Sequence, residues 1–204
     1  MLDVTDRLVV IIGGGAVASR KVAGLLAAGA TRVRVVSPQF DPKMPASVEI
    51  ERISERYEPR HLDGAALVFA ATDSAEVNSA VVAAARRRGI FVDRADGIDE
   101  GGDFSTPAVL RDGTVTVTVS TAGSPAIAAA IRDSLRDALD ARWVVLANAM
   151  RSLRPAILAS GLAPNARREL FRAMAGEDVV ELVSRGGEAA LRAWIEQRIG
   201  KTLA

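Results

Sequence analysis

The sequence predicts an α/β protein in which a parallel-sheet domain is followed by a strand–helix segment and a small helical C-terminal domain. Over residues 1–112, short runs of branched aliphatic residues alternate with helical patterns. This alternation is typical of a parallel sheet covered by helices on both faces. Residues 113–147 contain a strand pattern of period two and then a long amphipathic pattern, and residues 148–204 are helical throughout. We therefore expect three segments, 1–112, 113–147 and 148–204.

The sheet domain begins with a strand of uniform composition. Leu8 to Ile12 are five branched aliphatic residues, as expected for a strand buried on both faces. A helix follows and ends at Gly29. Its helical spacing is carried by Val17, Lys21, Leu25 and Ala28. Further strands are predicted at 32–36, 48–53, 66–71 and 90–93, with a helix at 74–88 that Asp73 or Ser74 caps.

The second segment combines a β-type pattern with a capped helix. Thr114 to Val119 alternate Thr and Val, which favours a strand. Ser124 and Pro125 then form a helix start, with Ser as the cap and Pro at the first helical position. The apolar stripe of this helix contains Ile127, Ile131, Leu135 and Leu139. So broad a stripe favours a dimer interface over packing within a monomer. In the last segment, breaks are expected at Pro155, Pro164 and Gly186-Gly187.

Composition excludes several kinds of function. The 204 residues include 26 Lys+Arg against 25 Asp+Glu, a net charge of +1 that argues against a nucleic-acid partner. There is no Cys and only one His, which excludes disulfides, thiolate metal sites and poly-histidine metal sites; no metal is predicted. The longest apolar run is too short to cross a bilayer, and the first seven residues lack the positive charge of a secretory signal. We therefore expect a cytoplasmic protein with no membrane partner.

The most informative motif is Gly13 to Ala18, which fits the pattern G-x-G-x-x-G/A between a buried strand and a helix start. Gly13 permits the tight turn, Gly15 lets a pyrophosphate approach the backbone, and Ala18 allows close packing of helix on sheet. The amino end of the helix then offers N–H groups and partial positive charge to phosphates. The motif predicts a Rossmann-like, dinucleotide-binding domain. The alternative is a tight strand–helix turn that binds nothing.

The residues after the second strand leave the choice of dinucleotide open. An NAD site usually carries an acidic residue there for the ribose hydroxyls, and this chain has Ser37 and Pro38 instead. Ser37 would bind a ribose hydroxyl through one hydrogen bond. Arg32 and Arg34 are nearby in sequence and would favour the phosphorylated ribose of NADP.

Carboxylates follow two other predicted strands. Thr72 and Asp73 come after one strand, and Asp96 comes after the next, where a ligand of an open parallel sheet binds. Asp73 would equally serve as a helix cap, Asp96 as a turn residue, and Asp93 competes with Asp96 for the same role. The single histidine, His61, lies in a polar connecting segment and is expected to be solvated rather than catalytic.

Four motifs together resemble the precorrin-2 dehydrogenase family, which includes the amino-terminal module of siroheme synthase. In order along the chain they are Gly13 to Lys21, Val35 to Pro38, Leu67 to Asp73 with Asn78, and Ser120 to Pro125. The resemblance covers residues 1–140 well and the helical tail only by length. It implies NAD-dependent oxidation of precorrin-2 to sirohydrochlorin, a step towards sirohaem or cobalamin. It also implies a homodimer formed through residues 113–147.

The resemblance assigns roles to individual residues. Asp96 matches the family's catalytic Asp and is the expected general base. Ser124 matches a family Ser in the turn before the long helix, although this turn is one residue shorter here. Ser124 and Arg94 are expected to bind the carboxylates of the substrate, Arg94 on charge complementarity alone. The residues expected to bind NAD are Gly13, Gly14, Gly15, Ala16, Val17, Ser37, Pro38, Thr72 and Asp73.

Three alternatives stay open at this point. Some family members also insert iron into sirohydrochlorin, and Asp96 would again be the base for that reaction. A non-catalytic NAD-sensing module would share the fold, but such modules typically carry an acidic residue after the second strand. A generic dehydrogenase of small metabolites would usually need a separate substrate domain with a catalytic Lys or His, for which the tail has no obvious motif.

Overall fold

The computed structural model describes residues 2–96, 102–121 and 123–203. It divides the chain into two compact units, Met1–Thr106 and Pro107–Ala204. The division lies six residues before the predicted boundary at 112. The reason is that residues 108–112 form a strand of the second unit, which the sequence pattern did not predict. Residues 113–147 and 148–204 fall within that one unit, and a single helix runs across residue 147.

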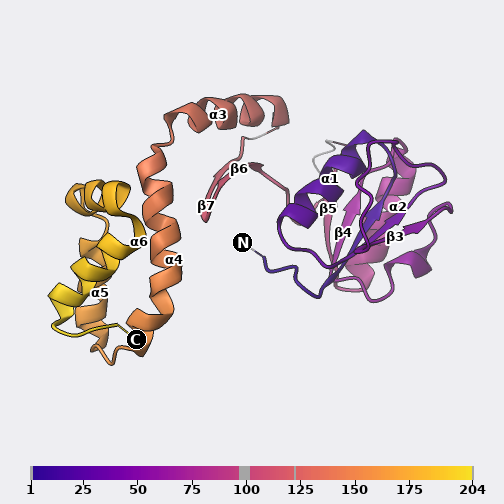
Figure 1. Ribbon diagram of the computed structural model, residues 1–204. Coiled ribbons are helices and arrows are strands. Elements are labelled where there is room, and N and C mark those ends of the chain that lie inside the picture. Colours follow the sequence, from indigo (N-terminus) through magenta and orange to yellow (C-terminus); the bar gives the residue numbers. More distant parts are fainter. Residues whose placement is uncertain (1, 97–101, 122, 204) are drawn as a thin grey trace. The chain divides into compact units, whose positions relative to one another are not determined.

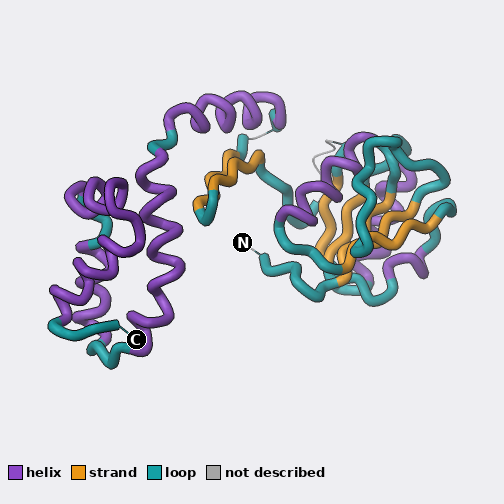
Figure 2. Tube along the Cα trace, in the orientation of Figure 1, coloured by secondary structure: helices purple, strands orange, loops and turns teal. Residues whose placement is uncertain are grey.

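The first unit contains the predicted Rossmann-like sheet (Figures 1 and 2). Five parallel strands lie in the order β3-β2-β1-β4-β5. Their bounds are β1 Leu8–Ile12, β2 Arg32–Val36, β3 Ile50–Ile53, β4 Leu67–Ala70 and β5 Phe91–Arg94. The connecting helices are α1 Ala16–Ala27, α2 Ala75–Arg87 and the short 3-10 helix η1 Pro59–Leu62. Because strand order reverses between β1 and β4, the carboxyl ends of these two strands form the ligand-binding edge of such a sheet.

The two faces of β1 belong to two different hydrophobic clusters. Val9 and Ile11 pack with α1, whereas Val10 and Ile12 pack with α2. All four are essentially inaccessible to solvent, which explains why this strand is uniformly aliphatic. Of the four residues expected at helical spacing in α1, Val17 and Ala28 are exposed. The buried residues of α1 are Ala18, Ser19, Val22 and Leu25.

His61 contradicts the expectation of a solvated side chain, because it is only 2% exposed. Its Nδ1 accepts a hydrogen bond from the backbone N–H of Glu58 at 3.0 Å, and its Nε2 lies 3.1 Å from the Glu55 carboxylate. The imidazole thus caps η1 from a position next to the core. Of its two neighbours in sequence, Arg60 is exposed, whereas Leu62 is buried together with the ring.

The described residues of the second unit form a β-hairpin and four helices. The hairpin strands are β6 Ala108–Asp112 and β7 Val115–Val119, paired antiparallel with Asp112 opposite Val115. The helices are α3 Pro125–Ala138, α4 Ala141–Ala159, α5 Pro164–Ala173 and α6 Glu177–Ile199. Strand β6 was not predicted, although the Asp-Gly pair at 112–113 is a strong hairpin signal. Gly113 has the positive φ of 52° that such a turn requires.

The helical tail is less broken than predicted. Pro155 lies inside α4, which continues to Ala159, so this proline does not end the helix. Pro164 begins α5, and Gly187 forms a kink within α6 at φ 60° and ψ −151°. Helices α4 and α6 pack along each other and share a core cluster with α5. Within the described residues, no helix combines the length and apolar character needed to span a bilayer.

Candidate dinucleotide-binding and catalytic site

The glycine turn after β1 lies where strand order reverses. Gly13 has a φ of +122°, and a Cβ at this position would lie 2.1 Å from the carbonyl oxygen of Ala71, just after β4. A Cβ on Gly14 would lie 2.0 Å from the carbonyl oxygen of Gln39. Both glycines are therefore required by the packing of the chain itself. Gly15 differs, because no described atom lies within 4 Å of its Cβ position. Its backbone is open to an approaching ligand.

The start of α1 adds hydrogen-bond donors to this open position. Gly15 is the N-cap and has no side chain that could accept a hydrogen bond from the first turn. The first helical bond runs from Ser19 N to Gly15 O, so the N–H groups of Ala16 and Val17 precede the hydrogen-bonded ladder. A helix amino end with an open glycine before it suits a diphosphate group. The residues present therefore fit the phosphates of a dinucleotide.

The carboxyl end of β2 meets the same turn. The side chain of Ser37 lies against Gly14, and its Oγ accepts a hydrogen bond from Gln39 N at 3.4 Å. The two arginines considered for a phosphorylated ribose are elsewhere. Arg32 is exposed at the opposite, amino end of β2. Arg34 donates to the Glu51 carboxylate at 2.7 Å, across the β2–β3 pair.

The end of β4 is organised around Asn78, which is completely buried. Its Oδ1 accepts hydrogen bonds from Thr72 N and Thr72 Oγ1, at 3.1 and 2.8 Å. Asp73 is exposed and does not cap α2. The cap is Ser74, whose Oγ accepts from Val77 N at 3.2 Å. Of the two cap candidates the structure selects Ser74, and Asp73 is left at the ligand-binding edge of the sheet.

Asp96 lies two residues beyond β5 and is held by side chains from two elements. Arg94 donates from Nε to Asp96 Oδ1 at 2.6 Å and from Nη2 to Oδ2 at 2.8 Å. Asn78 donates from Nδ2 to Asp96 Oδ2 at 2.9 Å. The hydrogen bond to Asp96 raises the pKa of the Arg94 guanidinium. The carboxylate of Asp96 is thus held by a guanidinium from its own strand end and by the amide of α2.

Asp93, the competing candidate, is committed elsewhere. It is 4% exposed within β5 and forms an ion pair with Lys21 of α1. Lys21 also donates to Thr106 Oγ1 at 2.7 Å and lies 4.9 Å from the centre of the Phe69 ring. Asp93 therefore ties α1 to β5 from within the core. Asp93 thus lies inside the sheet domain, whereas Asp96 lies beyond the end of β5.

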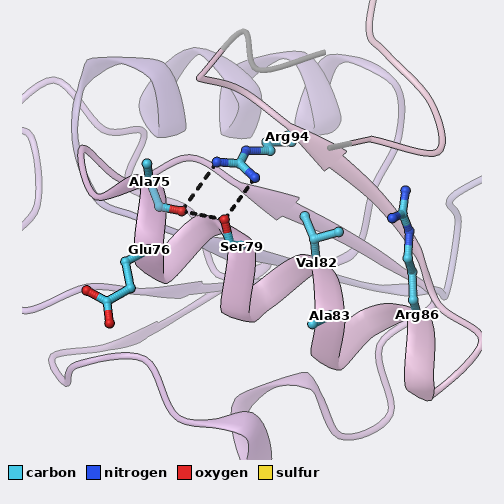
Figure 3. Close-up of a pocket in the computed structure, with 7 residues that line it drawn as sticks. All are labelled: Ala75, Glu76, Ser79, Val82, Ala83, Arg86 and Arg94. Atoms are coloured by element: carbon cyan, nitrogen blue, oxygen red, sulfur yellow. Dashed lines mark hydrogen bonds between the residues drawn. The ribbon is translucent and has the colours of Figure 1, made fainter. Parts of the chain in front are cut away.

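A hollow of about 530 Å³ lies along α2 beside this cluster (Figure 3). The guanidinium of Arg94 bends over the first two turns of the helix, towards Ser79. Arg86 lies at the far end of the hollow and pairs with Asp103 at 3.1 Å. The lining residues are Ala75, Glu76, Ser79, Val82, Ala83, Arg86 and Arg94.

Ser124 lies in the second unit, at the start of α3. Its Oγ accepts from Ile127 N at 3.4 Å, as predicted for the N-cap of α3, and its carbonyl oxygen accepts from Thr121 Oγ1 at 2.6 Å. Within the described residues, no group of three or more His, Asp or Glu is arranged to hold a metal ion.

No sequence pattern predicted how the side chains of this cluster contact one another. Asn78 was expected only as part of a family motif, and Arg94 only as a residue that binds the substrate. The spacing of Arg94 and Asp96, both near a strand end, was the available sign of an ion pair. No local pattern links Asn78 to Asp96, because the two meet only when β4, β5 and α2 are assembled.

The parallel sheet, the glycine turn and the uncapped helix start define a Rossmann-like dinucleotide-binding domain. A family model described as "Putative NAD(P)-binding" matches residues 1–108. The chain belongs to this family.

Curated relatives extend the similarity beyond the sheet domain. A siroheme synthase of Chromobacterium violaceum is 39% identical over 202 residues, covering 97% of this chain and 43% of the relative. A siroheme synthase of Methylobacillus flagellatus is 35% identical over 204 residues, covering 96% and 42%. The chain thus spans less than half the length of these relatives.

A solved structure shares the fold. It is named "SirC, precorrin-2 dehydrogenase", and the alignment covers 97% of this chain and 98% of that one with a TM-score of 0.73 and 21% sequence identity.

Proposed function

We propose that this chain oxidises precorrin-2 to sirohydrochlorin, with NAD as the hydride acceptor and Asp96 as the general base. The observation that carries the proposal is the cluster around Asp96, which follows β5 and is hydrogen-bonded to Asn78 beside the end of β4. Similarity to siroheme synthases over almost the whole chain, and a fold shared with a precorrin-2 dehydrogenase, support the substrate class.

The proposed cofactor site uses the edge of the sheet at β1, β2 and β4. When bound, NAD supplies a two-electron acceptor for hydride. The turn and the start of α1 would hold its diphosphate, and the ends of β2 and β4 would hold its two ribose-bearing halves. The residues proposed for these contacts are Gly13, Gly14, Gly15, Ala16, Val17, Ser37, Pro38, Thr72 and Asp73.

The proposed reaction removes one hydride and one proton from the macrocycle, so that sirohydrochlorin and NADH form and the proton passes to a base. Asp96 accepts that proton at a carboxylate oxygen. The macrocycle carries many carboxylates, and the helix start at Ser124 stays our candidate for binding one of them. Arg94, which was also expected to bind one, already donates its guanidinium N–H groups to Asp96, Ser79 and Ala75.

We favour NAD over NADP because neither candidate for binding a ribose phosphate faces the site. Arg34 is paired with Glu51, and Arg32 lies at the opposite end of its strand. Ser37 suits a ribose hydroxyl and carries no charge for a phosphate.

Spectroscopy with enzymatically prepared precorrin-2 tests the proposal. With NAD, the purified protein should generate the absorbance of NADH together with that of sirohydrochlorin, and NADP should be a poorer acceptor. Asp96→Asn should bind NAD normally and lose about 10²- to 10⁴-fold in kcat, the usual contribution of a general base. Asp63→Asn, an exposed carboxylate of the same unit, is the matched control and should retain activity. Absence of turnover by the wild type would refute the proposed function, and full activity of Asp96→Asn would refute the role of the base.

A further inference from the structure

We propose that Arg94, together with Asn78, is a positioning residue that fixes the orientation of the Asp96 carboxylate for proton transfer. This inference rests on the proposed function, in which Asp96 is the base. It gives Arg94 a role that acts through Asp96, distinct from direct contact with the substrate.

The guanidinium of Arg94 is held as a rigid fork. Its side chain is 7% exposed. Two of its N–H groups donate to the two carboxylate oxygens of Asp96. Its Nη1 also donates to Ser79 Oγ at 3.0 Å, and its Nη2 donates to Ala75 O at 3.3 Å (Figure 3). Ser79 Oγ in turn lies 2.8 Å from Ala75 O. The guanidinium therefore connects the end of β5 to the first two turns of α2, and its planar geometry sets the plane of the carboxylate.

Asn78 restrains the same carboxylate from the side of β4. Its Nδ2 donates to Asp96 Oδ2 at 2.9 Å and to Thr72 O at 3.0 Å, and its Oδ1 accepts two bonds from Thr72. All four hydrogen-bonding positions of this buried amide are thus occupied. Because rotation of the amide would break several bonds at once, it holds Asp96 at a defined distance from the end of β4.

These restraints matter because Asp96 lies outside regular structure. A carboxylate two residues beyond a strand would otherwise sample several rotamers. Proton transfer requires the accepting oxygen to lie within hydrogen-bond distance of the reacting group, and misplacement of about 1 Å can lower the rate about 100-fold. A bidentate guanidinium and a buried amide together leave the carboxylate one orientation.

A double-mutant cycle on the full chain tests the inference. The variants are Arg94→Met, Arg94→Lys, Asp96→Asn and the double variant Arg94→Met/Asp96→Asn. We expect Arg94→Met to lower kcat by up to about 100-fold with a much smaller change in KM. In the Asp96→Asn background, the same substitution should lower kcat no further, because its effect passes through Asp96. Arg94→Lys keeps the charge without the fork and should recover part of the lost kcat.

Arg86→Met is the matched control. Arg86 lines the same hollow and pairs with a different carboxylate, Asp103, so this variant should retain the wild-type kcat. A readout independent of turnover is the ¹³C resonance of the Asp96 carboxyl group, which should shift in Arg94→Met and stay in place in Arg86→Met. If Arg94→Met does not fold, Arg94→Lys and Ser79→Ala serve for the same comparison.

The outcomes separate the inference from the proposed function. A wild type that turns over precorrin-2, with Arg94→Met as active as Arg86→Met, would overturn the inference alone. A rise in KM at unchanged kcat, or an additional loss of kcat in the Asp96→Asn background, would make Arg94 a substrate contact or a structural residue and would also overturn it. A wild type without turnover would reject the proposed function and the inference with it.

Discussion

At the scale of single residues, the three consecutive glycines of the turn have different reasons for lacking a side chain. Gly13 and Gly14 are in close contact with the backbone of other loops, whereas the Cβ position of Gly15 faces open space. The first two are therefore needed for folding, and the third is the one at which a ligand would meet the chain.

This difference predicts opposite consequences for two similar substitutions. Gly14→Ala should lower the free energy of unfolding by about 1–3 kcal/mol, because the new Cβ overlaps the carbonyl of Gln39. Gly15→Ala should leave the stability almost unchanged, since its φ of −78° suits alanine, but should weaken the binding of NAD. Urea unfolding and calorimetric titration with NAD measure the two effects. A destabilised Gly15→Ala with normal NAD affinity would show that the turn does not bind the cofactor through this position.

At the scale of elements, one arginine joins the starts of two helices in the second unit. Arg142, in the first turn of α4, pairs with Asp140 at 2.7 Å and with Glu177 and Glu181 of α6 at 2.9 and 3.1 Å. Hydrogen bonds to Asp140 and then to Glu181 raise the pKa of Arg142. Hydrogen bonds from Arg142 lower the pKa of Asp140 and of Glu181.

This ion-pair cluster predicts a pH-dependent contribution to stability. A carboxyl group whose pKa is lower in the folded state stabilises the fold above its unfolded value and loses that contribution as the pH falls through the folded value. Arg142→Met should therefore lower Tm at pH 7, and the difference from wild type should shrink below the ordinary values of 4.5 for Glu181 and 3.8 for Asp140.

Thermal melts followed by circular dichroism between about pH 3 and 7 measure this effect. Arg151→Met, on an exposed arginine of the same helix, is the control and should show no such pH dependence. Because the pairs are largely solvated, added salt should also reduce the effect of Arg142→Met. An equal loss of Tm at every pH would assign the effect to packing of the side chain.

At the scale of the whole molecule, the apolar stripe of α3 points to association of two copies. Ile127, Ile131 and Leu135 are 56%, 40% and 38% exposed on this helix. Three large apolar side chains at four-residue spacing form a continuous exposed stripe, which is typical of an interface. We propose a homodimer in which residues 113–147 of two chains pack together.

Charging this stripe should separate the subunits. Light scattering coupled to size exclusion should give twice the chain mass of 21.4 kDa for the wild type. Ile131→Glu should give a single chain, because a buried unpaired carboxylate at the interface is strongly unfavourable. Ala126→Glu places the same side chain on the same helix outside the stripe and should remain a dimer. A monomeric wild type would contradict the proposal.

Elements with strong local signals were predicted correctly. The aliphatic run of β1, the glycine turn, the Ser124 cap and the Thr–Val alternation of β7 each depend on neighbours within a few residues. Strand β6 was missed because only its first three residues are uniformly apolar, and the expected break at Pro155 did not occur because α4 continues through it.

By itself, the sequence determined the strands and the two α-helices of the sheet domain and the position of the glycine turn, because periodicity, capping and turn chemistry are properties of short segments. Only the tertiary structure decided which charged groups meet. It paired Arg34 with Glu51 and Asp93 with Lys21, and it brought the buried Asn78 to Asp96. The physical reason is that these contacts join segments whose proximity depends on sheet order and register, which no short stretch of sequence encodes.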